Sequence, residues 1–124
     1  MAMLRIPTDQ SDGKANLHQG AIGVPVEIET GITGSAMIKG RRIESHPDTG
    51  KILAGNIIPF WDTISKLAVT ASELIPLGYL GIDFVIDKTL GPLILELNAR
   101  PGLQIQVINN RGLMPLINRI ENEF

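Results

Sequence analysis

The clearest periodic pattern in the chain lies between Pro59 and Pro76, where apolar residues recur at steps of three and four. Those residues are Trp61, Ile64, Leu67, Ala68, Ala71, Leu74 and Ile75. Because this spacing places them on one stripe, the pattern predicts an amphipathic helix that ends at Pro76. A second stripe predicts a C-terminal helix with Pro115 in its first turn. That stripe consists of Leu113, Leu116, Ile117, Ile120 and Phe124.

Short strand-like segments occupy much of the remaining chain and are separated by turn residues. They are residues 4–7, 21–30, 35–39, 51–57, 79–86 and 92–97. Pro25 falls inside one of them and requires an edge strand or a bulge. The His-Pro-Asp-Thr-Gly segment at 46–50 predicts a chain reversal, because Pro47 fixes φ and Gly50 supplies a left-handed position. His46 is interpreted as a turn residue.

The order of these elements predicts the fold class. Strands and helices are mixed without strict βαβ alternation, which favours an α+β fold in which helices cover one face of a mainly antiparallel sheet. A chain of 124 residues is long enough for one hydrophobic core and too short for two independent domains. We therefore expect residues 1–124 to be a single domain or part of one.

Composition excludes several classes of protein. With 11 Lys and Arg against 13 Asp and Glu, the net charge of -2 predicts no nucleic-acid partner. The chain has no cysteine, which excludes disulfides, thiol nucleophiles and cysteine-based zinc sites and favours a reducing compartment, the cytoplasm. No apolar run approaches the ~20 residues that span a bilayer, so we expect no membrane association.

The segment from 81 to 98 predicts a β-hairpin that brings two acidic residues together. If its turn is centred between Thr89 and Leu90, Asp83 lies across from Glu96. The opposite face is then apolar and buried, which fixes the register because a slip of one residue would invert both faces. That face consists of Ile82, Phe84, Ile86, Leu93, Leu95 and Leu97.

Asn98 shares the face of the two carboxylates, because side chains alternate along a strand. Two carboxylates and an amide oxygen form the hard oxygen set that Mg²⁺ or Mn²⁺ prefers. Directly opposed like charges destabilise a sheet, and a cation between them reverses that effect. The alternative is that Asp83 and Glu96 are simply the solvated side of an amphipathic hairpin.

Arg100 follows two residues after Asn98, before Pro101 and Gly102 break the strand. Its planar guanidinium suits a phosphate or carboxylate beside a metal-bound nucleotide. The alternative is an ordinary solvated arginine at the end of a strand.

A second candidate site lies in the glycine-flanked segment 13–20. Lys14, Asn16 and His18 recur every two residues, so an extended segment would direct all three side chains the same way. Together they could hold oxyanions, with Arg5 as a fourth contributor. The alternative is a plain polar hairpin tip.

Several separated motifs together resemble one protein family. Asp83 followed by Gly-Pro-Leu-Ile-Leu-Glu-Leu-Asn-Ala-Arg-Pro-Gly at 91–102 resembles the metal-binding end of the ATP-grasp fold. Lys-Ala-Asn-Leu-His-Gln-Gly at 14–20 is similar to a segment of the glutamate ligases that modify ribosomal proteins. With the motifs at 46–50 and 78–83, nearly the whole chain resembles the alpha-L-glutamate ligase-related ATP-grasp proteins.

That resemblance implies an ATP-dependent carboxylate–amine ligase, in which a carboxylate is phosphorylated to an acyl phosphate and an amine then attacks to form an amide. The residues it implies are Asp83, Glu96 and Asn98 as ligands of Mg²⁺ or Mn²⁺, Arg5, Lys14 and Asn16 as contacts to ATP phosphates or the transferred group, and Arg100 as the catalytic residue that neutralises charge near the acceptor. The implied partners are ATP and a carboxylate/amine substrate pair.

What matches is the C-terminal portion of an ATP-grasp domain, so we expect residues 1–124 to lack the upstream nucleotide-binding lobe. Such a portion alone is expected to bind ATP weakly, to be inactive, and to form homo-oligomers through surfaces that the lobe would cover. Two alternatives remain: a noncatalytic binding or regulatory module on the ATP-grasp scaffold, and a small structural protein without a ligand.

Overall fold

The computed structural model describes residues 1–123, which form two compact units. Unit 1 contains Met1–Asn56 and the chain from Leu103 onward, and unit 2 contains Ile57–Gly102. The predicted α+β class with antiparallel sheets is confirmed, and each unit has a sheet of its own. No helix among the described residues is long and apolar enough to cross a membrane.

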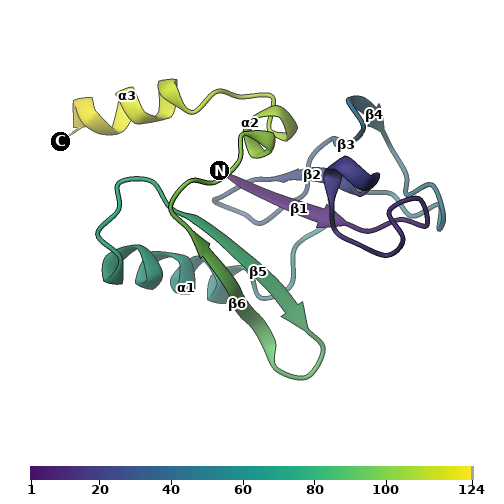
Figure 1. The fold of residues 1–124 in the computed structure, drawn as a ribbon, viewed down its shortest axis with the longest axis horizontal. Helices are drawn as coiled ribbons and strands as arrows, with labels where there is room; N and C mark the ends of the chain where they lie inside the picture. The colour runs from purple at the N-terminus through teal and green to yellow at the C-terminus, as the bar shows by residue number, and fades with distance from the viewer. Residues whose placement is uncertain (124) are drawn as a thin grey trace. The chain divides into compact units, whose positions relative to one another are not determined.

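Unit 1 is built on a four-stranded antiparallel sheet in the order β1-β2-β3-β4 (Figure 1). The strands are β1 (Ala2–Ile6), β2 (Ile22–Val26), β3 (Ala36–Ile38) and β4 (Arg41–Ile43). A short 3-10 helix, η1 (Leu17–Gln19), precedes β2. Strand order therefore follows chain order, because each strand pairs with the next one along the sequence.

One face of this sheet carries the hydrophobic core. Leu4 pairs with Val24, and Ile6 pairs with Ile22, so the apolar residues of β1 and β2 alternate onto the same face. The buried core residues are Ile22, Val24, Ala36 and Leu53, with Leu4, Ile6, Ile38 and Ile43 packed against them. The alternating sequence pattern thus determines which face is buried.

Pro25 occupies a central strand, where the sequence predicted an edge or a bulge. It pairs with Met3 on β1, and its carbonyl accepts a hydrogen bond from the backbone N–H of Gly34 (2.8 Å). The proline nitrogen faces the same side, where regular β2–β3 pairing is confined to Gly23 and Met37. The missing N–H is tolerated there because the ladder is already interrupted.

Two turns shape the middle of unit 1. Lys39 and Gly40, with φ of 45° and 77°, form the two-residue turn between β3 and β4. The predicted reversal at 46–50 is confirmed, because Ser45 pairs with Ile52 across it.

The chain returns to unit 1 in two helices, α2 (Gln104–Ile108) and α3 (Met114–Glu123). The sequence pattern missed α2, which packs against β1 and β2 (Figure 1). A Cβ on Gly23 would lie 2.4 Å from Cδ1 of Ile108, so the glycine allows the helix to approach the sheet closely. The predicted C-terminal helix is confirmed as α3, although none of its residues is buried and Phe124 lies outside the described residues.

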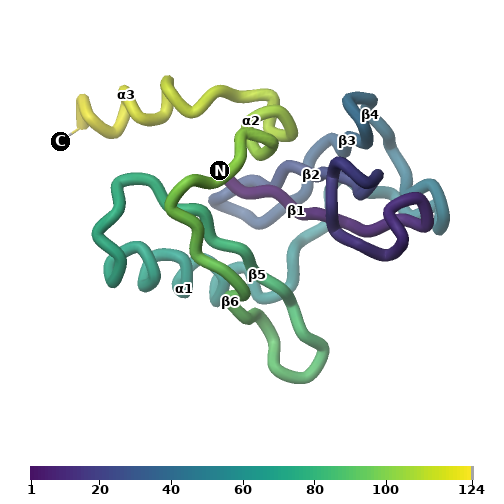
Figure 2. Tube along the Cα trace, in the orientation of Figure 1, coloured from purple at the N-terminus to yellow at the C-terminus, as the bar shows by residue number. Residues whose placement is uncertain are grey.

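Unit 2 contains α1 (Trp61–Leu74) and a hairpin of β5 (Gly81–Asp87) and β6 (Gly91–Asn98). Figure 2 shows the two strands running side by side into one turn. The predicted helix is confirmed, with Ile64 and Ala71 of its stripe buried. Leu74 was predicted to share that stripe but is 76% exposed at the end of the helix.

Candidate metal centre and phosphate loop

The β5–β6 hairpin places two acidic residues directly opposite each other. Asp83 pairs with Glu96, and Gly81 pairs with Asn98. Because side chains alternate between the faces of a strand, Asp83, Glu96 and Asn98 share one face. The register predicted for this end of the hairpin is confirmed.

The register predicted for the turn end is wrong by one residue. A β-bulge after Asp83 leaves Leu95 as an extra residue on β6, so that Phe84 lies opposite Ile94. The predicted apolar face grouped Leu93 and Leu95 with Phe84, and the bulge divides that group. Leu95 is 67% exposed rather than buried. A bulge bends its strand and redirects the side chains beside it, and here it adjoins the acidic pair.

The side chain of Asn98 is oriented by the turn that follows β6. Its Oδ1 accepts a hydrogen bond from the backbone N–H of Arg100 (3.0 Å). An amide oxygen has two lone pairs, so one remains for a cation or a water molecule. The hydrogen bond therefore holds the proposed ligand atom in place without consuming it.

Gly81 allows the chain after β6 to fold closely over β5. A Cβ on Gly81 would lie 2.6 Å from the Cβ of Pro101, which leaves no space for a side chain. This contact fixes the segment that carries Arg100, whose side chain is exposed. Arg100 and the three proposed metal ligands thus all belong to unit 2.

The donor set at this end of the hairpin fits a hard divalent cation. Asp83 is half-buried and Glu96 is exposed. Among residues 1–123, no group of three or more His, Cys, Asp or Glu side chains forms a metal cluster. Two carboxylates and one amide oxygen fit an ion such as Mg²⁺, which fills its remaining positions with water and substrate phosphate.

The segment 13–20 is not extended throughout, because it ends in η1, so the expected common direction does not continue to His18. Asn16 is the N-cap of η1, and its Oδ1 accepts a hydrogen bond from the backbone N–H of His18 (2.9 Å). Asparagine competes for backbone groups in this way at helix starts, which the alternation pattern does not reveal. All three side chains remain exposed.

Arg5 lies on β1, opposite Gly23, and is exposed. It shares unit 1 with Lys14 and Asn16. The seven proposed residues are therefore divided between the units: the phosphate contacts lie in unit 1, and the metal ligands with Arg100 lie in unit 2.

Two polar residues that the sequence did not single out fix the loop at 7–20. Thr8 and Ser11 are buried, with 4% and 1% exposure. Thr8 N–H donates to Ser11 Oγ (2.9 Å), Ser11 Oγ donates to the Thr8 carbonyl (3.0 Å), and Thr8 Oγ1 donates to the carbonyl of Gly20 (2.8 Å). The Asp-Gly pair at 12–13 favours a turn in this loop, but no sequence pattern marks the buried hydroxyls, because their pairing depends on tertiary packing.

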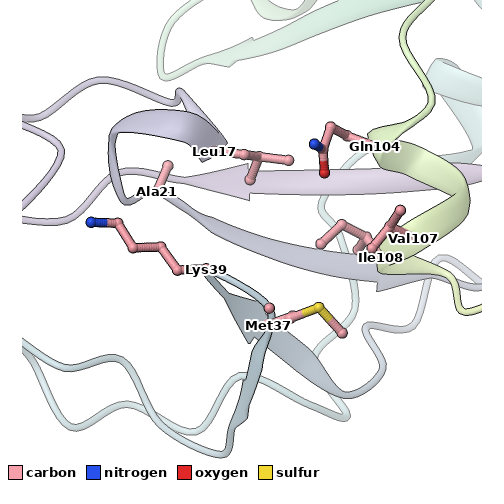
Figure 3. A pocket seen from close by; sticks show the side chains of 8 residues that line it. Leu17, Ala21, Met37, Lys39, Gln104, Val107 and Ile108 are labelled. Carbon is pink, nitrogen blue, oxygen red and sulfur yellow. The ribbon is translucent and has the colours of Figure 1, made fainter.

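A hollow of about 310 Å³ lies in unit 1 on the sheet face that α2 covers (Figure 3). Its lining is mostly apolar, and Lys39 and Gln104 are the lining residues with polar side chains. The lining residues are Leu17, Ala21, Met37, Lys39, Gly40, Gln104, Val107 and Ile108. No motif in the sequence predicted it, because the segments that form it are separated along the chain.

The hairpin turn contains a carboxylate with a perturbed pKa. Asp87 Oδ1 accepts hydrogen bonds from the backbone N–H groups of Leu90 and Thr89, each at 2.8 Å. Because these bonds favour the charged form, they lower the pKa of Asp87 below its ordinary value. Asp87 therefore stabilises the turn between the strands that carry the proposed metal ligands.

One protein family, described as sugar-transfer associated ATP-grasp, has a model that matches residues 1–122. No curated protein and no solved structure matches the chain. The family match spans both units and all seven proposed site residues, and it confirms the ATP-grasp resemblance. It indicates an ATP-dependent, ligase-like function, whereas the similarity to ribosomal-protein glutamate ligases stays a prediction.

Proposed function

We propose that this chain, which belongs to the sugar-transfer associated ATP-grasp family, supplies the metal-binding portion of an ATP- and Mg²⁺-dependent carboxylate–amine ligase. The overall reaction joins a carboxylate to an amine as an amide and releases ADP and phosphate. The γ-phosphoryl group first passes to a carboxylate oxygen, and the amine nitrogen then attacks the acyl carbon with departure of phosphate. The proton released by the amine balances that second step.

The single observation that carries this proposal is the pairing of Asp83 with Glu96, with Asn98 on the same face. Opposed carboxylates on paired strands repel each other by about 0.2–1 kcal/mol, and a cation held between them would offset that repulsion. When bound there, Mg²⁺ would neutralise phosphate oxygens and orient the phosphates for transfer.

The other proposed residues supply positive charge and orientation. The backbone N–H of Arg100 donates to Asn98, and the exposed side chain of Arg100 would neutralise charge near the acceptor. Arg5 and Lys14 would contact phosphate oxygens. The Oδ1 of Asn16 already caps η1, so its side-chain NH₂ group is the part that would donate to a phosphate or to the transferred group.

The substrates follow from two different arguments. Similarity of segment 14–20 to glutamate ligases favours glutamate as one member of the carboxylate/amine pair. The family description associates this ATP-grasp type with sugar transfer, which favours a sugar-bearing molecule as the second member. Neither argument changes the ligase chemistry, which requires only a carboxylate and a nucleophilic nitrogen.

The chain would act as the C-terminal portion of an ATP-grasp domain together with a nucleotide-binding lobe. Surfaces suited to such an association are present on unit 2. Leu93, Ile94, Leu95 and Leu97 of β6 are each at least a third exposed. Because a lone two-stranded hairpin is marginally stable in water, further strands or a second copy of the chain would stabilise it.

Mn²⁺ titration followed by electron paramagnetic resonance tests the proposed metal site. The full chain should bind Mn²⁺ saturably, and Glu96→Gln and Asp83→Asn should each weaken binding at least about tenfold, because each removes a charged ligand. Glu73→Gln, an exposed acid on α1, is the matched control and should bind like the wild type. Equal binding by Glu96→Gln would contradict the proposal and favour a structural protein without a ligand.

ADP release separates a ligase from a binding module. With the nucleotide-binding lobe supplied, the protein should release ADP only when a carboxylate and an amine are both present. Arg100→Gln should lower the rate of ADP release while leaving Mn²⁺ binding intact. Metal binding with no ADP release under any of these conditions would favour a noncatalytic module.

A further inference from the structure

The turn at 46–48 connects two segments of unit 1 that are far apart in sequence. The backbone N–H of Asp9 donates a hydrogen bond to Asp48 Oδ2 (2.8 Å), and His46 Nε2 lies 3.1 Å from the carbonyl oxygen of Pro7. Both contacts join residues that are 39 positions apart. They therefore tie the start of the 7–20 loop to the chain reversal that follows β4.

His46 connects the two segments through both of its ring nitrogens. The backbone N–H of Asp48 donates to His46 Nδ1 (3.1 Å), so Nδ1 is assigned as the unprotonated nitrogen. Nε2 then carries the proton, and this N–H donates a hydrogen bond to the carbonyl of Pro7. The side chain of His46 is only 11% exposed, and that of Asp48 is 27% exposed. A residue that only forms a turn on a solvated loop does not need its side chain to be buried to this extent.

The loop that this turn holds carries two of the three proposed phosphate contacts, Lys14 and Asn16. The buried hydroxyl of Thr8 reaches the carbonyl of Gly20, so the loop is closed at both its ends. Lys14 and Asn16 lie in its exposed part. A loop that is ordered before its ligand arrives does not lose affinity to the entropy of ordering.

We propose that His46 and Asp48 are positioning residues, which hold the 7–20 loop so that Lys14 meets an anionic phosphate oxygen. They have this role only under the proposed function, in which Lys14 contacts phosphate. Neither residue touches the ligand, and both act through the backbone of Pro7 and Asp9.

Inorganic phosphate is the probe for the test, added to the ¹⁵N-labelled full chain while the amide resonances of the loop are followed. Lys14→Gln should abolish the saturable shifts. His46→Ala and Asp48→Ala should raise the apparent Kd for phosphate about fivefold, because the loop must then be ordered during binding. Asp87→Ala, which removes a carboxylate with similar backbone contacts in unit 2, should leave the Kd unchanged.

Conservative variants separate positioning from general destabilisation. His46→Gln keeps an N–H donor that can reach the Pro7 carbonyl, and Asp48→Asn keeps an acceptor for the N–H of Asp9. Both should bind phosphate with nearly wild-type affinity. If an alanine variant does not fold, the conservative variants are compared with the wild type in its place. A folded His46→Ala protein with wild-type phosphate affinity and only a lower unfolding temperature would overturn the positioning role.

The outcomes also distinguish this role from the proposed function. If Lys14→Gln loses phosphate and both alanine variants bind as the wild type does, the positioning role is wrong and the phosphate role of Lys14 stands. If the wild-type loop shows no saturable shift with phosphate, both roles are wrong. Mn²⁺ binding at Asp83 and Glu96 is independent of either result.

Discussion

Asp83 lies across from Glu96 immediately before the bulge at which the β5–β6 ladder loses its regular pairing. The irregularity of the hairpin is therefore next to its acidic pair rather than at its turn. Bulges are over-represented beside functional sites, because the local bend that they introduce redirects a side chain.

The acidic pair should destabilise the metal-free protein. Glu96→Gln removes the repulsion and should raise the free energy of unfolding by about 0.2–1 kcal/mol in the presence of a chelator. With Mn²⁺ in excess the order should invert, because only the wild type gains the full binding free energy of the ion. Urea unfolding in chelator and in excess Mn²⁺ gives the sign of the difference in unfolding free energy between variant and wild type under each condition, with Glu73→Gln as the control. A variant that is less stable than the wild type in chelator would contradict the repulsion.

The turn carboxylate should make the stability of the hairpin depend on pH. Because the pKa of Asp87 is lowered in the folded state, its contribution is present above the unfolded-state pKa and is lost as pH falls through the folded-state pKa. The wild type should therefore lose more stability on acidification than Asp87→Asn, whose amide oxygen accepts the same hydrogen bonds without titrating. Urea unfolding at a series of acidic pH values gives the two slopes, and equal slopes would refute the prediction.

The approach of α2 to the sheet should make Gly23 sensitive to substitution. In Gly23→Ala the new Cβ would lie 2.4 Å from Cδ1 of Ile108, so this side chain must move, at a cost of about 1–3 kcal/mol. Ile108→Ala removes the clash, and the cost of Gly23→Ala should fall in that background. A double-mutant cycle by urea unfolding measures this coupling. Additive effects would show that α2 does not rest on Gly23.

The β3–β4 turn should be improved by a residue that tolerates positive φ. Lys39 has a φ of 45°, a conformation that costs an ordinary side chain about 1–2 kcal/mol. Asparagine adopts it readily, so Lys39→Asn should raise the unfolding temperature. Lys51→Asn, which removes the same charge at a position with no positive φ, is the matched control. An increase in both variants would point to charge rather than backbone conformation.

Local sequence patterns were sufficient to predict the elements whose apolar residues recur with a single period. The apolar stripe at 61–75 predicted α1, and the alternation on both sides of residues 87–91 predicted the β5–β6 pair. The pairing of Asp83 with Glu96 agrees with the prediction only because the bulge at Leu95 compensates for a register at the turn that is one residue off. The five-residue helix α2 escaped prediction, since it is too short to show a complete stripe.

By itself, the sequence determined the fold class, the long helix and the shared face of Glu96 and Asn98 on β6, because periodicity and spacing are local properties of the chain. Tertiary structure alone decided the bulge at Leu95, which brings Asp83 opposite Glu96, and the connection of His46 and Asp48 to the loop at 7–20. These features depend on which backbone groups meet across long separations, and hydrogen bonds of that kind leave no periodic trace in the residues that make them.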